Sequence, residues 1–257
     1  MIPVLLTPVL PEAFAYTLTL GGRFAGTQDW VVRPDKGTLV VRVQSDFGGA
    51  LPAGRRVLES RIEPETGYSL AYAEAEGSSR KPHFETIFDR NAGTVTLRQG
   101  KDEASSPLLE GHHDPLSLLL WLRGQAGTDQ LGTDQADTAQ AGTAQADAPA
   151  PEAPALSARL VGGRVQVQTL QGGIVLGQEA RVYLLRPGGA YVYVEQQAPH
   201  RLLRLIQPSD FGPVEALLTL ERPGVVASRE AARAGAAQGQ ARPVRGQVGK
   251  PRRRTSR

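Results

Sequence analysis

One segment, Asp114-Pro-Leu-Ser-Leu-Leu-Leu-Trp-Leu-Arg-Gly124, has the pattern of a helix in a chain that otherwise alternates like β-strands. Asp114 suits the N-cap, where its carboxylate accepts hydrogen bonds from the first turn, and Pro115 suits the first helical position. Arg123 suits the negative C-terminal end of a helix, and Gly124 suits the left-handed residue beyond it. We therefore expect a helix over about residues 114–123.

This predicted helix is apolar around nearly its whole circumference, because five leucines and Trp121 follow the cap within nine residues. A helix that faces water keeps a polar side, and this one has almost none. We therefore expect it to be buried, covering or filling the open side of a sheet.

Short strands are predicted on both sides of the helix. Phe14, Tyr16 and Leu18 point one way while their neighbours point the other, which is the period of a half-buried strand. Turns rich in Gly, Pro and Asn separate the repeats, and five glycine pairs, 172–173 among them, are expected at hairpin turns. The expected strands cover 14–20, 24–32, 39–44, 58–62, 68–74, 83–89 and 94–99 before the helix, and 156–160, 165–168, 179–185, 191–195, 202–206 and 214–220 after it.

These patterns predict a mainly β protein: a single antiparallel, partly open β-barrel or clam-like shell with one buried central helix. Its parts are an irregular N-terminal segment at 1–13 and a single β-rich domain at 14–227. A low-complexity insert at 124–155 interrupts that domain, and a basic tail follows at 228–257. The insert and the tail are expected to be disordered, because they hold too few large apolar side chains to offset their ordering entropy. The insert could also be a linker between two domains.

Charge is distributed unevenly along the 257 residues. The tail carries nine Lys or Arg against one Glu, a net charge of +8, whereas the insert carries four Asp and one Glu. The basic character therefore comes from the tail and not from a charged folded face. Cysteine is absent, which excludes disulfides and cysteine-ligated metals. No stretch reaches the ~20 apolar residues of a membrane-spanning helix, and the apolar start lacks the basic leader of an export signal.

The layout resembles the bacterial family catalogued as domain of unknown function 3108. The resemblance rests on the order of several motifs: the aromatic strand, glycine-rich turn and second strand over 14–30, Asp114-Pro-Leu-Ser117 at the helix start, Gly162-Gly163, the Pro-x-Arg step at 199–201, and Gly212-Pro-Val-Glu-Ala-Leu217. It covers about 14–221 and implies an exported or envelope-associated β-rich protein, similar to the half-open barrels that carry lipoproteins or lipids. It implies no catalytic residues.

His112-His113-Asp114 is the one cluster of metal-ligand residue types. Adjacent histidines on an extended chain point apart, a zinc site needs at least three convergent ligands, and Asp114 already suits a helix cap. We therefore predict no metal and interpret the cluster as a polar lead-in to the helix. No nucleophile elbow and no phosphate-binding or dinucleotide-binding loop is present, so we expect neither an enzyme nor a cofactor.

Two sets of residues are candidates for binding. Tyr191 and Tyr193 share one strand face and, with Trp121, could line an apolar ligand cavity, although ordinary strand packing also accounts for the tyrosines. In the tail, Lys250 and Arg252, Arg253 and Arg254 form a cation cluster that could attract nucleic acid or anionic lipid in a salt-sensitive way. A solubilising tail without a specific contact is the alternative.

Three functional hypotheses remain open at this point. The first is a non-enzymatic β-shell that binds an apolar small molecule or a partner in the cell envelope. The second is a cytoplasmic protein that its basic tail tethers to nucleic acid, and the third is a hydrolase whose site has no recognised motif. The sequence as written predicts a cytoplasmic location, and a start that lies further upstream would favour the envelope.

Overall fold

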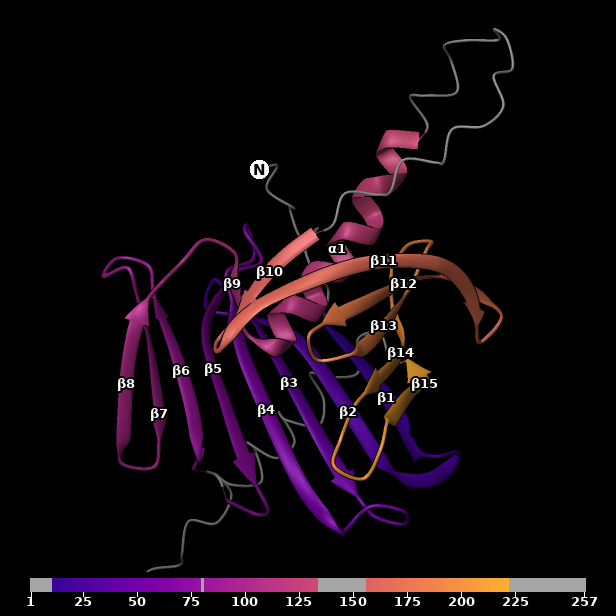
Figure 1. Cartoon of the computed structure of the whole chain (residues 1–257), viewed down its shortest axis with the longest axis horizontal. Coiled ribbons are helices and arrows are strands. Elements are labelled where there is room, and N and C mark those ends of the chain that lie inside the picture. Colours follow the sequence, from indigo (N-terminus) through magenta and orange to yellow (C-terminus); the bar gives the residue numbers. More distant parts are fainter. Residues whose placement is uncertain (1–10, 80, 134–155, 222–257) are drawn as a thin grey trace, which may run out of the picture.

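The structure of the chain, a computed structural model, describes residues 11–79, 81–133 and 156–221 (Figure 1). Within these residues, fifteen strands form one sheet around one helix. The first run of strands comprises β1 (Glu12–Leu20), β2 (Arg23–Asp35), β3 (Thr38–Phe47), β4 (Gly54–Ile62), β5 (Ser69–Glu76), β6 (Phe84–Asp89), β7 (Thr94–Gln99), β8 (Asp102–Pro107) and β9 (His112–His113). After the helix α1 (Pro115–Thr133) come β10 (Leu156–Leu160), β11 (Gly163–Val175), β12 (Gln178–Arg186), β13 (Ala190–Glu195), β14 (Leu202–Gln207) and β15 (Val214–Glu221).

The two runs of strands share the sheet, because β1 pairs with β2 on one side and with β15 on the other. The order is β8 to β1, then β15 down to β9, so the sheet has β8 and β9 as its two edges and does not close. The prediction of a partly open, antiparallel shell is thus confirmed. One pair departs from it: β9 runs parallel to β10 at Arg159–His112 and Leu160–His113.

The alternation predicted for the first strand is confirmed. Phe14, Tyr16 and Leu18 are buried in β1, and the Tyr16 hydroxyl donates a hydrogen bond of 2.8 Å to the carbonyl of Leu202 on β14. An apolar face with one satisfied polar tip is the usual form of a buried tyrosine. This contact ties the first strand of the first run to the second run of strands.

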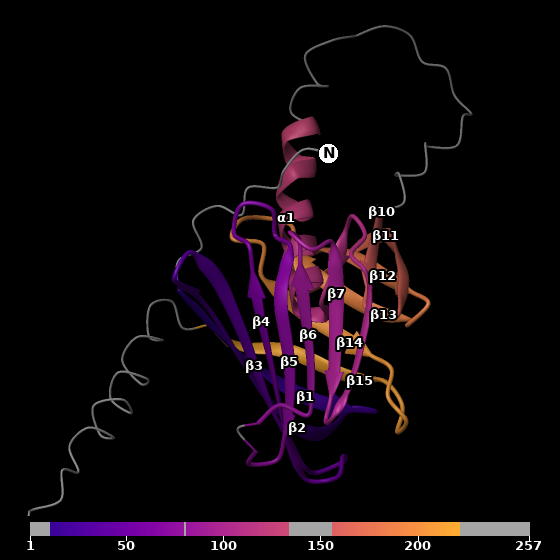
Figure 2. The ribbon, with the colours of Figure 1, turned by 90° about the vertical axis from the view of Figure 1, so that its left-hand side faces the viewer.

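The helix α1 enters the shell between the two runs of strands, and its later turns leave at one end (Figures 1 and 2). Its burial is confirmed along its first two turns, where the exposed fractions are all 6% or less for Leu116, Leu118, Leu119, Leu120 and Leu122, whereas Pro115 at the first position is exposed. A helix enclosed in this way contributes apolar surface to both runs of strands, which accounts for its composition.

The helix is longer than predicted, since it continues past Gly124 to Thr133. Ala126 is fully buried, and a β-carbon at Gly127 would lie 3.0 Å from His200 Nε2, so these small residues permit close packing against the loop after β13. Such tertiary contacts override the tendency of glycine to end a helix. The first residues of the predicted insert are therefore helical. Its remainder at 134–155 and the predicted tail at 228–257 lie outside the described residues.

One further prediction needs correction, and two strands differ from the expected set. The chain does not turn at Gln171–Gly173, because a register shift between Leu170 and Gly173 forms a β-bulge inside β11, and the turn comes at Leu176-Gly177. Strand β8 was not predicted, since its six residues are all exposed and show no alternation of apolar and polar side chains. In addition, β1 begins at Glu12, two residues before the expected start.

Candidate functional site

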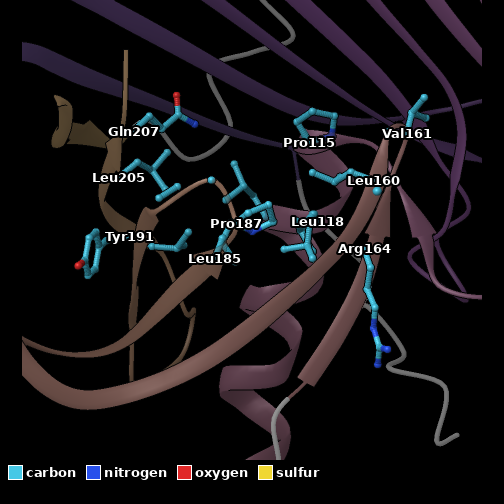
Figure 3. Close-up of a pocket in the computed structure, with 17 residues that line it drawn as sticks. Pro115, Leu118, Leu160, Val161, Arg164, Leu185, Pro187, Tyr191, Leu205 and Gln207 are labelled. Atoms are coloured by element: carbon cyan, nitrogen blue, oxygen red, sulfur yellow. The ribbon is translucent and has the colours of Figure 1, made fainter. Parts of the chain in front are cut away.

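A pocket with a volume of about 430 Å³ lies between the first turns of α1 and the strands β10 to β14 (Figure 3). The helix contributes Pro115, Leu118 and Leu119 to its wall. The β10–β11 and β12–β13 turns and the strands beside them contribute the rest, namely Leu160, Val161, Gly162, Gly163, Arg164, Val165, Leu185, Pro187, Gly188, Ala190, Tyr191, Val192, Leu205 and Gln207. Most of these side chains are aliphatic, so the pocket offers mainly hydrocarbon to a ligand.

Only three residues with polar side chains, Arg164, Tyr191 and Gln207, are part of the wall. In Figure 3 the guanidinium group of Arg164 and the hydroxyl group of Tyr191 point away from the other labelled side chains. The volume falls in the range of about 300–1,000 Å³ that is typical of small-molecule sites, which usually add a few convergent polar groups to an apolar wall. Here the polar ends of Arg164 and Tyr191 do not converge, which leaves Gln207 as the one other polar side chain of the wall, so the wall favours an apolar occupant.

The three residues predicted to line a cavity lie in different surroundings. Tyr191 is part of the pocket wall. Tyr193 is packed against the core, and the guanidinium carbon of Arg204 lies 5.2 Å from the centre of its ring. Trp121 lies on α1, with its ring centre 5.7 Å from that of His113. The structure therefore brings one of the three to the pocket and places the other two elsewhere.

A buried polar network holds the start of α1 against β4 and β5. The Asp114 side chain is 1% exposed, and its Oδ1 accepts hydrogen bonds from the backbone amides of Leu116 and Ser117 at 2.8 and 3.0 Å. Its Oδ2 accepts a bond of 2.6 Å from the hydroxyl of Ser60 on β4. The expected role of Asp114 as a helix cap is thus observed, and an additional bond to the sheet accompanies it.

Ser117 completes the cap, because its side chain bonds back to the backbone of the capping residue Asp114. The backbone amide of Asp114 donates hydrogen bonds to the hydroxyls of Ser117 at 3.0 Å and of Ser69 on β5 at 2.7 Å, and these two hydroxyls are 2.6 Å apart. Ser117 therefore has the part that Glu or Gln takes in a capping box. The Asp-Pro-Leu-Ser motif, together with Ser60 and Ser69, fixes where the helix begins relative to the sheet. We call these four residues, Ser60, Ser69, Asp114 and Ser117, the polar pin.

Burial changes the acid–base behaviour of the pin and its neighbours. It raises the pKa of Asp114, while the hydrogen bond from Ser60 and those from the helix amides oppose the rise. Burial, and then the charges of Arg90 and His112, lower the pKa of His113 to about 4, so its imidazole is neutral near pH 7. Burial and the charges of Arg159 and Arg90 also lower the pKa of His112.

His113 also lies beside a serine, with its Nδ1 3.3 Å from the Ser117 hydroxyl oxygen. That hydroxyl is fully buried. It accepts a hydrogen bond from the backbone amide of Asp114 and donates one of 3.1 Å to the backbone carbonyl of the same residue. His113, Ser117 and Asp114 are the residue types of a hydrolase triad and lie side by side. The hydrogen bonds between Ser117 and Asp114, however, are those of a helix cap. Among the described residues no group of three or more His, Asp or Glu could hold a metal ion.

A second contact holds α1 further along its length. The guanidinium group of Arg123 donates to a carboxylate oxygen of Glu12 at 3.0 Å and to the carbonyl of His200 at 3.0 Å. Arg123 was expected to stabilise the end of the helix, and it instead ties the middle of the helix to β1 and to the loop before β14. The pin and this contact hold the helix that forms one wall of the pocket.

Sequence reasoning did not find most of the pocket wall, because its residues come from separate turns whose closeness depends on the whole sheet. One residue of the pin did leave a signal. Ser60 occupies the same face as Leu58 and Ile62 in the predicted alternation, which places a hydroxyl on the buried side of β4.

The tail candidates Lys250, Arg252, Arg253 and Arg254 lie outside the described residues, so tethering to nucleic acid stays a prediction. Within the described ranges, no helix is both long enough and apolar enough to cross a membrane.

Comparisons with known proteins agree with this architecture. The family model described as "Protein of unknown function (DUF3108)" matches residues 15–219. The crystal structure of a beta-barrel-like protein of domain of unknown function DUF1849 from Brucella abortus has 8% sequence identity and a TM-score of 0.53, covering 84% of this chain and 98% of that chain. At this identity the likeness concerns the fold alone, and it supports a barrel-like shell. No curated protein matches the chain.

Proposed function

Because the chain belongs to the DUF3108 family, as its motifs predicted, and that family is one of unknown function, we propose a function from the pocket itself. The proposed function is the binding of an apolar ligand beside α1. The observation that carries this proposal is the aliphatic wall of the pocket, of about 430 Å³, formed by one helix and five strands with their turns. Burying apolar surface stabilises a complex by about 25 cal/mol for each Å² that leaves water. A hydrocarbon chain or ring system would therefore bind here without a directed polar contact.

The proposal is one of binding and not of catalysis. Two pin residues, Asp114 and Ser117, directly precede Pro115 and Leu118 of the wall, and the Ser117 hydroxyl is occupied by hydrogen bonds to the backbone of Asp114. A nucleophile needs a base that can take its proton and a space where a substrate can reach it. Ser117 has 0% exposure, which supports a structural role for it. The cell envelope as the place of binding stays a prediction.

A neutral probe tests the proposal. The apolar dye N-phenyl-1-naphthylamine gains fluorescence when it leaves water, so titration of the full chain reports on apolar sites. Leu160→Trp, a change at the half-buried end of β10 in the pocket wall, should fill the pocket and weaken the dye complex at least about tenfold, which corresponds to 1.4 kcal/mol. Leu109→Trp makes the same change at an exposed loop leucine and serves as the matched control.

The expected outcome is saturable dye binding that Leu160→Trp weakens and Leu109→Trp leaves unchanged. Equal affinities in all three proteins would show that the dye binds elsewhere, and the pocket would then not be the site. A thermal unfolding scan of each protein separates a filled pocket from a damaged fold, because only a damaged fold lowers the melting temperature markedly.

A further inference from the structure

The β11–β12 hairpin ends in an apolar tip, Gly172-Gly-Ile-Val-Leu-Gly177, which has no polar side chain. At the tip, the side chain of Ile174 is 78% exposed and that of Leu176 is 52% exposed, whereas Val175 between them is 8% exposed and belongs to the core. The two exposed side chains thus point out of the shell. In Figure 1 this turn lies at the outer edge of the described fold.

The backbone of the tip shows that the fold itself does not require a leucine there. Leu176 has a φ of +54° and Gly177 a φ of +76°, so the pair forms a two-residue turn with both residues in the left-handed region. Such turns favour Asn-Gly, because asparagine adopts this conformation readily and a leucine does so at a cost. Asn at 176 would relieve this strain and remove apolar surface from water, so its absence indicates a use for the leucine outside the fold.

The chemistry of the tip points to hydrocarbon as its partner. Surfaces that dock on proteins are enriched in aromatic residues and arginine and form hydrogen bonds, and the tip offers none of these side chains. The first charged side chain across the hairpin is that of Glu179, which pairs with Ile174. Because this carboxylate has to stay among the lipid headgroups beside Ile174, insertion is limited to the ends of the Ile174 and Leu176 side chains.

We propose that the tip Gly172–Gly177 inserts Ile174 and Leu176 into the surface of a lipid bilayer. The inference rests on the proposed function in one respect: a ligand that is apolar throughout partitions into membranes, so a protein that collects it has to reach a membrane surface. Two aliphatic side chains bury little area, so the contact is weak and reversible. That strength suits a protein that visits a bilayer and leaves it again.

The absence of cysteine allows a clean test on the full chain. A single Leu176→Cys protein is labelled with an environment-sensitive fluorophore and mixed with vesicles of phosphatidylcholine, whose zero net charge avoids attraction of the basic tail. Ile87→Cys, labelled in the same way at an exposed position of β6, is the control. The label at 176 should shift to the blue and gain intensity with vesicles, and the label at 87 should not.

Equilibrium binding of unlabelled proteins to immobilised phosphatidylcholine vesicles, followed by surface plasmon resonance, completes the test because it also detects a weak, reversible contact. Ile174→Ser with Leu176→Asn should abolish vesicle binding, and it should not lower the melting temperature, because Asn relieves the strained turn. The matched control Ile87→Ser with Leu109→Asn removes an exposed Ile and Leu, 38% and 45% exposed, from the other run of strands and should bind vesicles like the parent. If the parent does not bind the vesicles, or if the tip variant binds them equally well, the bilayer is not the partner of the tip. Dye binding in the pocket that persists in such a protein would leave the proposed function standing.

Discussion

The two sides of α1 are held by different kinds of contact. Toward β4 and β5, the polar pin joins helix and sheet through buried hydrogen bonds of 2.6 to 2.7 Å. Toward β11 to β14, the helix meets aliphatic side chains across a space of about 430 Å³. Directional bonds fix a position and leave little room for adjustment, whereas apolar contacts tolerate a gap that another molecule can fill. The pin therefore positions the helix, which leaves its other side available for a ligand.

The largest effect is expected from removing the centre of the pin. Asp114→Ala should destabilise the protein by about 3 kcal/mol, because a lost cap costs about 1 kcal/mol and unsatisfied buried donors cost about 1–3 kcal/mol more. Urea unfolding measures the change, and Asp210→Ala in an exposed loop is the control. A loss for Asp114→Ala no larger than that of the control would mean that the pin does not hold the helix.

Acid should lower the stability of the fold through protonation of His113, which lies beside the polar pin. Because its folded pKa of about 4 lies below its ordinary value, the folded state favours neutral imidazole, and stability is lost as the pH falls from about 6.5 toward 4. We expect a loss of about 2 kcal/mol over this window, partly offset by Asp114, whose raised pKa relieves its own burial cost on protonation. His113→Phe keeps a ring beside Tyr68 and Trp121 and should flatten the profile. His83→Phe, at an exposed position, should reproduce the parent profile; a parent-like profile for His113→Phe would assign the acid sensitivity to other groups.

The smallest effect is expected on the pocket side. Leu205→Met conserves volume in the pocket wall, so the stability change should stay below about 1.5 kcal/mol. Dye affinity should change by less than about tenfold, since flexible methionine fits the same space. Unfolding and dye titration of one preparation give both numbers. A loss as large as that of Asp114→Ala would mean that both sides of the helix are equally rigid.

Local signals in the sequence predicted the parts of the fold that depend on neighbouring residues. The helix start was predictable because Asp114 and Pro115 satisfy capping rules within one turn, and β1 was predictable from the alternation of Phe14, Tyr16 and Leu18. The helix end was not, because the packing of Gly127 against His200 joins residues far apart in the chain. Contacts of that kind outweigh local propensity.

The candidate site was harder to predict than the fold, for the same reason. Ser60 shares the alternating face of Leu58 and Ile62, which is a local signal for a buried hydroxyl, yet its partner Asp114 lies 54 residues away and no pattern connects the two. The pocket wall combines turns from two hairpins with the side chain of Leu205, and only the path of the whole sheet brings them together. Of the predicted trio, Tyr191 reaches this wall because its strand begins beside one of those turns.

The most direct test of the central claim is mass spectrometry of small molecules that copurify with the folded chain. Organic extracts of the parent, Leu160→Trp and Leu109→Trp proteins are compared after identical purification. An apolar molecule present in the parent and in Leu109→Trp, and depleted in Leu160→Trp, is the expected result. The same molecules in equal amounts from all three proteins, or none from any of them, would contradict an apolar ligand in the pocket beside α1.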